Sequence, residues 1–218
     1  MRLCHYNVVL STLPQHVKLV AVSKMRPLAQ IEALYQMGHR VFGENRPQEM
    51  KAKYEALPKD IEWHFIGHLQ TNKIKYIAPY ISLIHSVDSF SLLQEINRIA
   101  AKNNRIIPCL LQFFIAQETT KYGFSWEECT KMLENPVFYT LNNINIAGVM
   151  GMATFTDDKE VVRHEFKKLH EYFSQLKTQY FSNHFDFKEI SMGMSDDYEV
   201  AIEEGSTMVR IGSAIFND

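Results

Sequence analysis

Eight short apolar segments that alternate with helical patterns constrain the fold of this 218-residue chain more than any other feature. The segments are rich in Val, Ile, Leu and Phe, as strands buried on both faces usually are. Strict alternation of strands with helices predicts parallel strands joined by right-handed crossovers. We expect the strands at 17–23, 40–44, 61–67, 81–87, 106–115, 144–150, 187–191 and 208–211.

Between the strands, apolar residues recur at the spacing of amphipathic helices. Pro27 suits the first turn of one helix and Gly38 its end, and Asp88 or Ser89 suits the cap of another. We expect further helices at 46–57, 70–78, 126–133, 159–179 and 196–204, whereas residues 1–16 show no clear period.

Eight strand–helix units in about 200 residues fit a closed (β/α)₈ barrel at the small end of its size range. An open doubly wound sheet is the alternative. It is disfavoured because the first strand is followed neither by a GxGxxG sequence nor by a GxxxxGK[ST] loop. No repeat, linker or low-complexity segment interrupts the series. The sequence therefore predicts one α/β domain over residues 1–218.

The composition excludes several classes of protein. Hydrophobic residues make up 46% of the chain and charged residues 22%, as in an ordinary globular protein. The 23 basic and 25 acidic residues nearly balance, so we expect no binding to nucleic acid or to an anionic membrane. No apolar run approaches the ~18 residues of a membrane span, and no signal peptide is recognisable. Cys4, Cys109 and Cys129 form no disulfide framework, which favours a reducing compartment, the cytoplasm.

The carboxyl ends of the predicted strands carry most of the chemically useful residues. In a parallel barrel these ends meet at one mouth, where such folds build their active sites. The run 18–24 ends in Lys24, which by itself is typical of a solvated lysine at a strand end. Together with that lysine, the polar groups after the other strands indicate a site, although turns favour some of them anyway. These groups are Glu44, Asn45, Arg46, Gly67, His68, His85, Ser86, Thr154, Ser191, Ser195, Arg210, Gly212 and Ser213.

The last two of these loops suggest a phosphate site. Barrels often bind phosphate with the loops after strands seven and eight. Ser195 can cap the following helix, whose free amides suit an anion, and Gly212 and Ser213 offer amides and a hydroxyl. Arg210 can orient the ligand. The alternatives are a plain helix cap for Ser195 and, for Arg210, a buried ion pair with a glutamate.

Lys24 becomes chemically meaningful opposite such an anion site. A lysine must be neutral to attack an aldehyde, so its pKa must fall from about 10.4. We expect burial at the mouth and a nearby guanidinium to lower it. A lysine that forms a Schiff base and faces a phosphate site is typical of a pyridoxal phosphate protein or of a sugar-phosphate aldolase. The residues alone leave both open.

The histidines are weaker candidates. His64 and His68 have the spacing of a helical metal pair but span the end of a strand, which argues against a metal site. His164 and His170 are expected on the solvated side of the long helix at 159–179. No Ser/His/Asp arrangement is indicated by their order.

Seven blocks of the sequence, in order, resemble the pyridoxal phosphate homeostasis protein family, which has the fold of the alanine racemase N-terminal domain. The similarity extends from about Val17 to Phe216, and the blocks read KLVAVSK, VFGENRPQE, WHFIGHLQTNK, IHSVDS, GVMGMATF, SMGMSDDYEVAI and GSTMVRIGSAIF. The resemblance implies a (β/α)₈ barrel of that type, with pyridoxal 5'-phosphate (PLP) held as an internal aldimine on Lys24.

The same match implies roles for other residues of the site. Ser195, Gly212 and Ser213 are expected to hold the phosphate, with Arg210 near the phosphate or the ring. Asn45 and His68 are expected to line the pocket. Lys121 matches a family loop and is a second lysine that could react with the aldehyde, although an exposed loop lysine is the simpler interpretation.

The resemblance implies a protein that binds PLP and serves its intracellular homeostasis without an established catalytic activity. The alternative is a fold-type III racemase or decarboxylase. Such enzymes close the mouth with a second domain or a partner subunit, and this sequence ends directly after the eighth unit. A Schiff-base aldolase is disfavoured by the match.

The partners expected are PLP and the apo forms of enzymes that use it. The chain itself is expected to be a monomer or a weak homodimer. Family members usually carry a longer helix before the first strand than these 16 residues allow, which leaves oligomer contacts of that helix in question.

Overall fold

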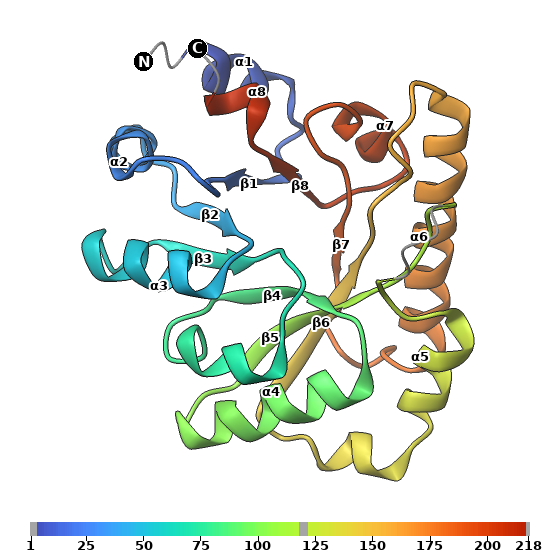
Figure 1. Ribbon diagram of the computed structural model, residues 1–218. Coiled ribbons are helices and arrows are strands. Elements are labelled where there is room, and N and C mark those ends of the chain that lie inside the picture. The colour runs from blue at the N-terminus through green and yellow to red at the C-terminus, as the bar shows by residue number, and fades with distance from the viewer. Residues whose placement is uncertain (1–3, 118–121, 217–218) are drawn as a thin grey trace.

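The computed structural model describes residues 4–117 and 122–216, in which eight parallel strands close into a barrel (Figure 1). Each strand pairs with the next one along the chain, and β8 returns to pair with β1. The predicted closed barrel is confirmed, and the strands are mostly shorter than predicted. They are β1 (Lys18–Val22), β2 (Val41–Glu44), β3 (Glu62–Phe65), β4 (Leu83–Val87), β5 (Ile107–Gln112), β6 (Ile144–Met150), β7 (Glu189–Ser191) and β8 (Met208–Ile211).

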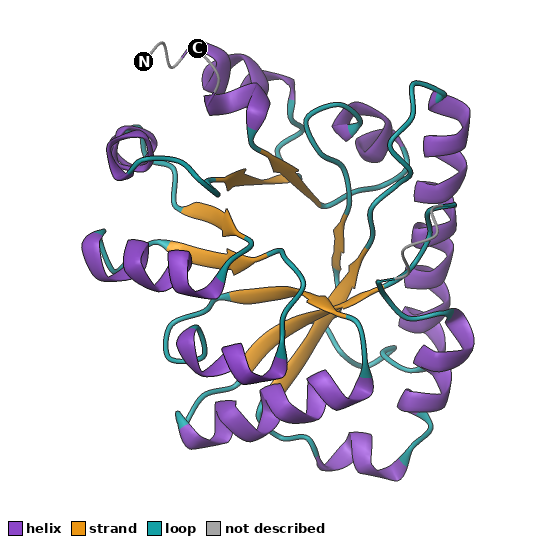
Figure 2. Cartoon of the chain, viewed as in Figure 1, coloured by secondary structure: helices purple, strands orange, loops and turns teal. Residues whose placement is uncertain are grey.

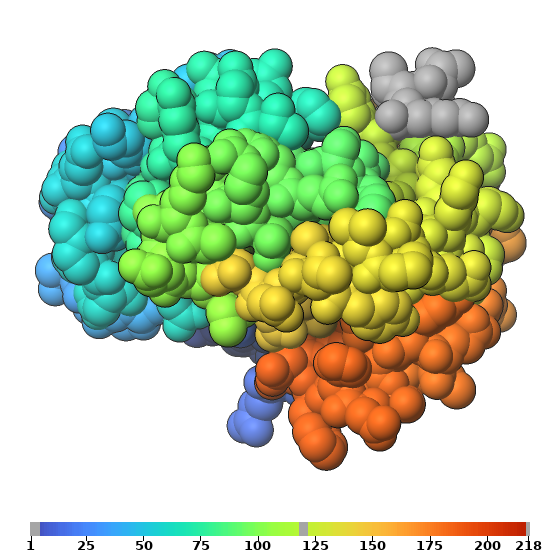
Figure 3. Space-filling view, turned by 90° about the horizontal axis from the view of Figure 1, so that it is seen from below, coloured from blue at the N-terminus to red at the C-terminus, as the bar shows by residue number. Residues whose placement is uncertain are grey.

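Helices form the outer layer around the barrel (Figure 2). On the face seen in Figure 3, segments follow one another around the molecule in chain order, as a singly wound barrel requires. The α-helices are α1 (Cys4–Thr12), α2 (Leu28–Gln36), α3 (Pro47–Ala56), α4 (Phe90–Lys102), α5 (Trp126–Leu133), α6 (Lys159–Gln179), α7 (Tyr198–Glu203) and α8 (Ser213–Phe216). Two 3₁₀-helices, η1 (Thr71–Tyr76) and η2 (Pro136–Thr140), complete the layer. Within the described residues, no helix has the length and hydropathy needed to cross a bilayer.

Several segments differ from the predictions: η2 and α8 were not predicted, and α7 begins two residues later than expected. The expected helix at 70–78 is a short 3₁₀-helix, η1. Residues 4–12, for which no period was found, form α1. Of residues 5–12 of this helix, Tyr6 and Val9 alone are buried in the core, so the local pattern is weak. α1 lies beside α8 (Figure 1), and the Tyr6 hydroxyl lies 3.2 Å from His39 Nδ1. Tertiary packing, which a local pattern does not report, therefore stabilises α1.

The helix ends mostly follow the expected chemistry. Ser89, one of the two predicted caps, accepts a hydrogen bond from the Leu92 amide at the start of α4. At α5, Ser125 and Glu128 form a reciprocal capping box, which satisfies two otherwise free amides. These local devices explain why the predicted bounds of α5 agree with the structure.

Apolar side chains fill both the barrel axis and the space between the barrel and the helices. Val20, Leu110 and Met208 belong to the axial cluster, whereas Phe42 and Trp63 pack in the outer one. Alternate residues of a strand point to opposite faces, so each strand supplies both layers. A side chain on Gly43 would come within 2.9 Å of Val20 Cγ1. The interior is thus a packed core that supports the mouth above it.

Candidate functional site

A cavity of about 590 Å³ opens at the carboxyl ends of the strands. Seven of the eight strand ends contribute to its wall, because the closed barrel brings them to one mouth. All the residues that the sequence singled out for cofactor binding line this cavity, namely Lys24, Asn45, His68, Ser195, Arg210, Gly212 and Ser213. The structure thus brings together seven positions spread over 190 residues of sequence.

Lys24 follows the buried end of β1 and has an exposed side chain. The expected burial of this amine is therefore wrong. Ser23 is the last buried residue of the segment, and Met25 has a left-handed backbone with φ 60° that turns the chain outward. No hydrogen bond or ion pair joins Lys24 to any other described residue. Its amine is therefore available to a ligand in the cavity.

Arg210 points from β8 into the barrel interior and is only 4% exposed. Its guanidinium donates hydrogen bonds to Ser191 Oγ at 2.6 Å and to the Gly151 carbonyl at 3.0 Å. Burial lowers the pKa of Arg210 to about 10, against an opposing effect of Asp197, so the side chain remains a cation at neutral pH. Among the described residues it forms no ion pair, so the glutamate partner considered as the alternative is not found. A buried cation that has the charge of Asp197 nearby but no direct ion pair with a described residue suits an anionic or electron-rich ligand.

Two buried histidines continue the hydrogen-bonded chain below Arg210. His85 Nδ1 lies 2.9 Å from Ser191 Oγ, and His85 Nε2 lies 3.0 Å from His64 Nδ1. Burial lowers the pKa of His64 to about 3 and that of His85 well below its ordinary value, so both rings are neutral. Ser191 Oγ accepts from Arg210 and also contacts His85, and the direction of the two bonds that involve the histidines depends on their tautomers. A continuous series of hydrogen-bonding contacts in the barrel interior thus holds Arg210 in place.

The histidines differ from the sequence interpretation. His85 was expected at the rim but lies in the barrel interior, because its position on β4 points inward. His64 and His68 do not meet: His68 is exposed at the mouth, with Nδ1 3.0 Å from Asp88 Oδ2. No group of three potential metal ligands occurs in the part of the chain that the structure describes. His164 is exposed as predicted, whereas His170 is half-buried and bonded to the Glu204 carbonyl.

The loops after β7 and β8 meet at the cavity, but not by the predicted helix cap. α7 begins after Asp197, and Ser195 Oγ instead accepts from the Ala214 amide at 3.4 Å, at the start of α8. The expected cap was wrong because the helix starts later than its pattern indicated. No described residue accepts a hydrogen bond from the amides of Gly212 and Ser213. These two amides and the Ser195 hydroxyl are available to an anion.

Asn45 contributes the opposite wall of the cavity. Its side-chain Oδ1 is buried and has no hydrogen-bond partner among the described residues. Gly67 packs closely against it, since a Cβ there would lie 2.5 Å from the Asn45 carbonyl oxygen. Buried polar atoms usually have a partner, so this orphaned oxygen indicates a ligand donor.

Other residues of the wall were not singled out from the sequence. Gln112 is buried at the end of β5 and donates to the Tyr122 carbonyl at 3.2 Å. A glutamine in an otherwise apolar strand is the signal that could have identified it. The exposed side chains of Met152, Phe155 and Met194 form an apolar rim, for which the sequence carries no comparable signal. Lys121 lies outside the described residues.

Comparisons with known proteins agree with this geometry. The family model "Alanine racemase, N-terminal domain" matches residues 5–218. A pyridoxal phosphate homeostasis protein of Aquifex aeolicus is 43% identical over 204 residues, covering 92% of this chain and 86% of the relative. One of Synechocystis sp. is 38% identical over 218 residues, covering 98% and 96%.

Among solved structures, PipY of Synechococcus elongatus is similar in both of its states. Without PLP it has a TM-score of 0.91, and with PLP bound 0.87, each at 33% identity and 98% coverage of both chains. Alanine racemase of Bartonella henselae is 17% identical with a TM-score of 0.71, and the match covers 98% of this chain and 57% of that one. The last likeness shows the shared fold alone.

Proposed function

The chain belongs to the pyridoxal phosphate homeostasis protein family, and from that premise we propose that it binds PLP covalently through Lys24 and helps to maintain the intracellular supply of this cofactor. One observation carries the proposal: a lysine, a buried arginine and two backbone amides face a single cavity, and no described residue forms an ion pair with the lysine or the arginine or accepts a hydrogen bond from the two amides. The relatives are named as homeostasis proteins and not as enzymes, which agrees with the expected absence of catalysis.

The residues at the mouth fit the parts of PLP. The cofactor supplies an aldehyde that condenses reversibly with an amine and releases water. Lys24 offers that amine, because no described residue pairs with it. The amides of Gly212 and Ser213 and the Ser195 hydroxyl suit the phosphate.

The remaining groups suit the ring. Arg210 is held by Ser191 and brings positive charge to the cavity. Asn45 Oδ1 lacks a partner and can accept a hydrogen bond. His68 lines the same wall, where its bond to Asp88 orients the imidazole.

The test is chemical trapping. The purified protein with PLP should show an absorption band that borohydride abolishes, and peptide mapping should place the reduced adduct on Lys24. Lys24→Ala should lose the band and keep the fold, because a rim residue contributes little to the core. Lys73→Ala, another lysine near the mouth, serves as the matched control and should keep the band. Dominant labelling of Lys73 or Lys121 would contradict the assignment.

We also propose that residues 1–218 act as one domain, a monomer or a weak homodimer, and that apo-enzymes receive PLP from it. A single unfolding transition and a sedimentation series test the first two points. For delivery, the loaded protein is mixed with an apo-enzyme. Transfer faster than spontaneous release of PLP supports a direct partner, whereas transfer at the release rate would contradict it. The chain's near-neutral charge supports our further expectation that neither nucleic acid nor a membrane is a partner.

A further inference from the structure

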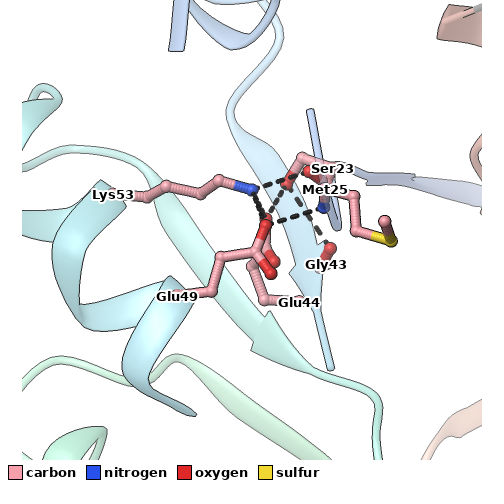
Figure 4. Close-up of polar contacts among 6 residues, drawn as sticks. All are labelled: Ser23, Met25, Gly43, Glu44, Glu49 and Lys53. Carbon is pink, nitrogen blue, oxygen red and sulfur yellow. Dashed lines mark hydrogen bonds and ion pairs between the residues drawn. The ribbon is translucent and has the colours of Figure 1, made fainter. Parts of the chain in front are cut away.

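A buried ion cluster lies directly behind the turn that carries Lys24 (Figure 4). Its centre is Lys53 of α3, which is only 5% exposed. The Lys53 ammonium donates to the Ser23 carbonyl at 2.7 Å, to Glu44 Oε1 at 2.7 Å and to Glu49 Oε1 at 2.6 Å. An ammonium has three N–H donors, so Lys53 is fully used. Unlike Lys24, it offers no free amine to a ligand.

The cluster anchors both chain neighbours of Lys24. On one side, Ser23 accepts from Lys53 through its carbonyl and donates from Oγ to Glu44 Oε1 at 2.6 Å. On the other side, the Met25 amide donates to Glu49 Oε1 at 2.7 Å. Lys24 itself makes no contact of this kind with the described residues. The arrangement fixes the backbone around Lys24 and leaves its side chain free.

The turn needs such an anchor because its backbone is unfavourable. Met25 has φ 60°, a left-handed conformation that residues with a Cβ rarely adopt. Its side chain is 78% exposed, so packing of Met25 does not hold the turn. Two hydrogen bonds hold this backbone instead: the Arg26 amide donates to the Ser23 carbonyl across the turn at 3.0 Å, and the Met25 amide donates to Glu49.

Charge keeps the two carboxylates in place around Lys53. Burial raises the pKa of Glu44, an effect that the hydrogen bonds from Lys53 and Ser23 oppose. Partial burial would raise the pKa of Glu49 as well, but its bonds to Lys53 and to the Met25 amide outweigh it and lower the pKa. Glu49 therefore stays ionised at neutral pH and remains a strong acceptor for the Met25 amide.

We propose that Glu49 and Lys53 are positioning residues that hold Lys24 where its amine can bond to an aldehyde in the cavity. This inference rests on the proposed function. In that reaction the neutral Lys24 nitrogen bonds to the aldehyde carbon, and the aldehyde oxygen leaves as water with the two amine protons. Glu49 and Lys53 exchange no proton or electron in this step. They fix the point from which Lys24 reaches the carbon.

Two ligands separate positioning of Lys24 from general damage to the pocket. PLP bonds to Lys24, whereas pyridoxine 5'-phosphate has the same ring and phosphate with an alcohol in place of the aldehyde. For Glu49→Ala we expect the affinity for PLP to fall about tenfold, equal to about 1.4 kcal/mol. The affinity for pyridoxine 5'-phosphate should stay within about twofold of the wild type, given typical scatter of such differences.

Two further variants control the result. Glu49→Gln keeps an acceptor oxygen, so it should recover part of the PLP affinity. Glu55→Ala removes an exposed carboxylate of the same helix, which pairs only with Lys51 at 3.6 Å among the described residues, and should bind both ligands as the wild type does. Melting temperatures of all variants show whether each remains folded at the titration temperature.

The outcomes separate the proposed function from the positioning role of Glu49 and Lys53. If the wild type forms no adduct on Lys24, the proposed function fails and the positioning role fails with it. If the wild type reacts at Lys24 but Glu49→Ala retains full PLP affinity, only the positioning role is overturned. An equal loss for both ligands would also overturn it, because Glu49 would then support the pocket as a whole.

Discussion

Replacing Arg210 with methionine removes the buried cation of the cavity while filling most of its volume. In the free protein the charge is unfavourable, since burial lowers the pKa of Arg210 from 12.5 to about 10. At about 1.4 kcal/mol per pKa unit, holding the charge inside costs on the order of 3 kcal/mol relative to water. Because Arg210→Met has no buried charge, the free energy of unfolding should rise by that amount.

The hydrogen bonds of Arg210 offset this gain. The Gly151 carbonyl loses its bond from Arg210, and an unsatisfied buried acceptor costs about 1–3 kcal/mol. Ser191 Oγ also loses its bond from Arg210 but keeps its contact with His85, so the free-energy cost at Ser191 is smaller. The two effects nearly cancel, so we expect the free energy of unfolding to change by less than about 2 kcal/mol.

Ligand affinity should respond quite differently from stability. A charged hydrogen bond to a ligand is worth about 1.5–3 kcal/mol, so affinity for PLP and for pyridoxine 5'-phosphate should fall roughly 10- to 150-fold. Urea unfolding and ligand titration of the same sample measure both quantities.

Arg105→Met is the matched control for this experiment. Arg105 is a half-buried arginine that precedes β5, away from the mouth, and donates to the carbonyls of Ala78 and Ile81 at 2.7 Å each. It should lose stability and keep ligand affinity. The reasoning would be refuted if Arg210→Met bound both ligands normally, or if it lost more than about 3 kcal/mol of stability, which would make Arg210 a structural residue.

Three further predictions concern the pH, the phosphate and catalysis. Because the pKa of buried His64 is about 3, the unfolded state binds more protons than the native state below pH 6.5. Stability should therefore be complete above that pH and fall toward pH 3, with His64 contributing a loss of about 1.4 kcal/mol by pH 5.5. Urea unfolding above pH 6.5 and at pH 5.5 should show that His64→Leu loses less free energy of unfolding on acidification than the wild type does. An equal loss in both proteins would contradict a neutral His64 in the interior. Ser195→Ala should lower the affinity for both ligands about 2- to 10-fold, as loss of one neutral hydrogen bond does. Ligand titrations that give wild-type affinities would show that the phosphate does not bind at Ser195. With PLP bound, incubation with L-amino acids should give no racemisation or carbon dioxide release at enzyme-like rates, in line with relatives that are named as homeostasis proteins and not as enzymes. Turnover that disappears in Lys24→Ala would support the racemase or decarboxylase alternative.

Much of the fold could be predicted because its signals are local. The bounds of α5, α6, β6 and β8 agree with the prediction, since hydrophobic period, caps and turn residues lie next to one another in sequence. α1 was missed because only two of residues 5–12 face the core. The cap by Ser195 failed for a related reason, since α7 is only six residues long and its start is set by packing.

The sequence by itself determined the order of the strands and which residues follow their ends, and so placed Lys24 and Arg210 at one mouth. Only the tertiary structure decided which side chains meet. The contact of Lys53 with Ser23 spans 30 residues, and that of His85 with Ser191 spans 106. Such contacts depend on strand register and on the face to which each side chain points, and a shift of one residue reverses that face. The chain carries no local pattern for these contacts, so they are decided only when the barrel closes.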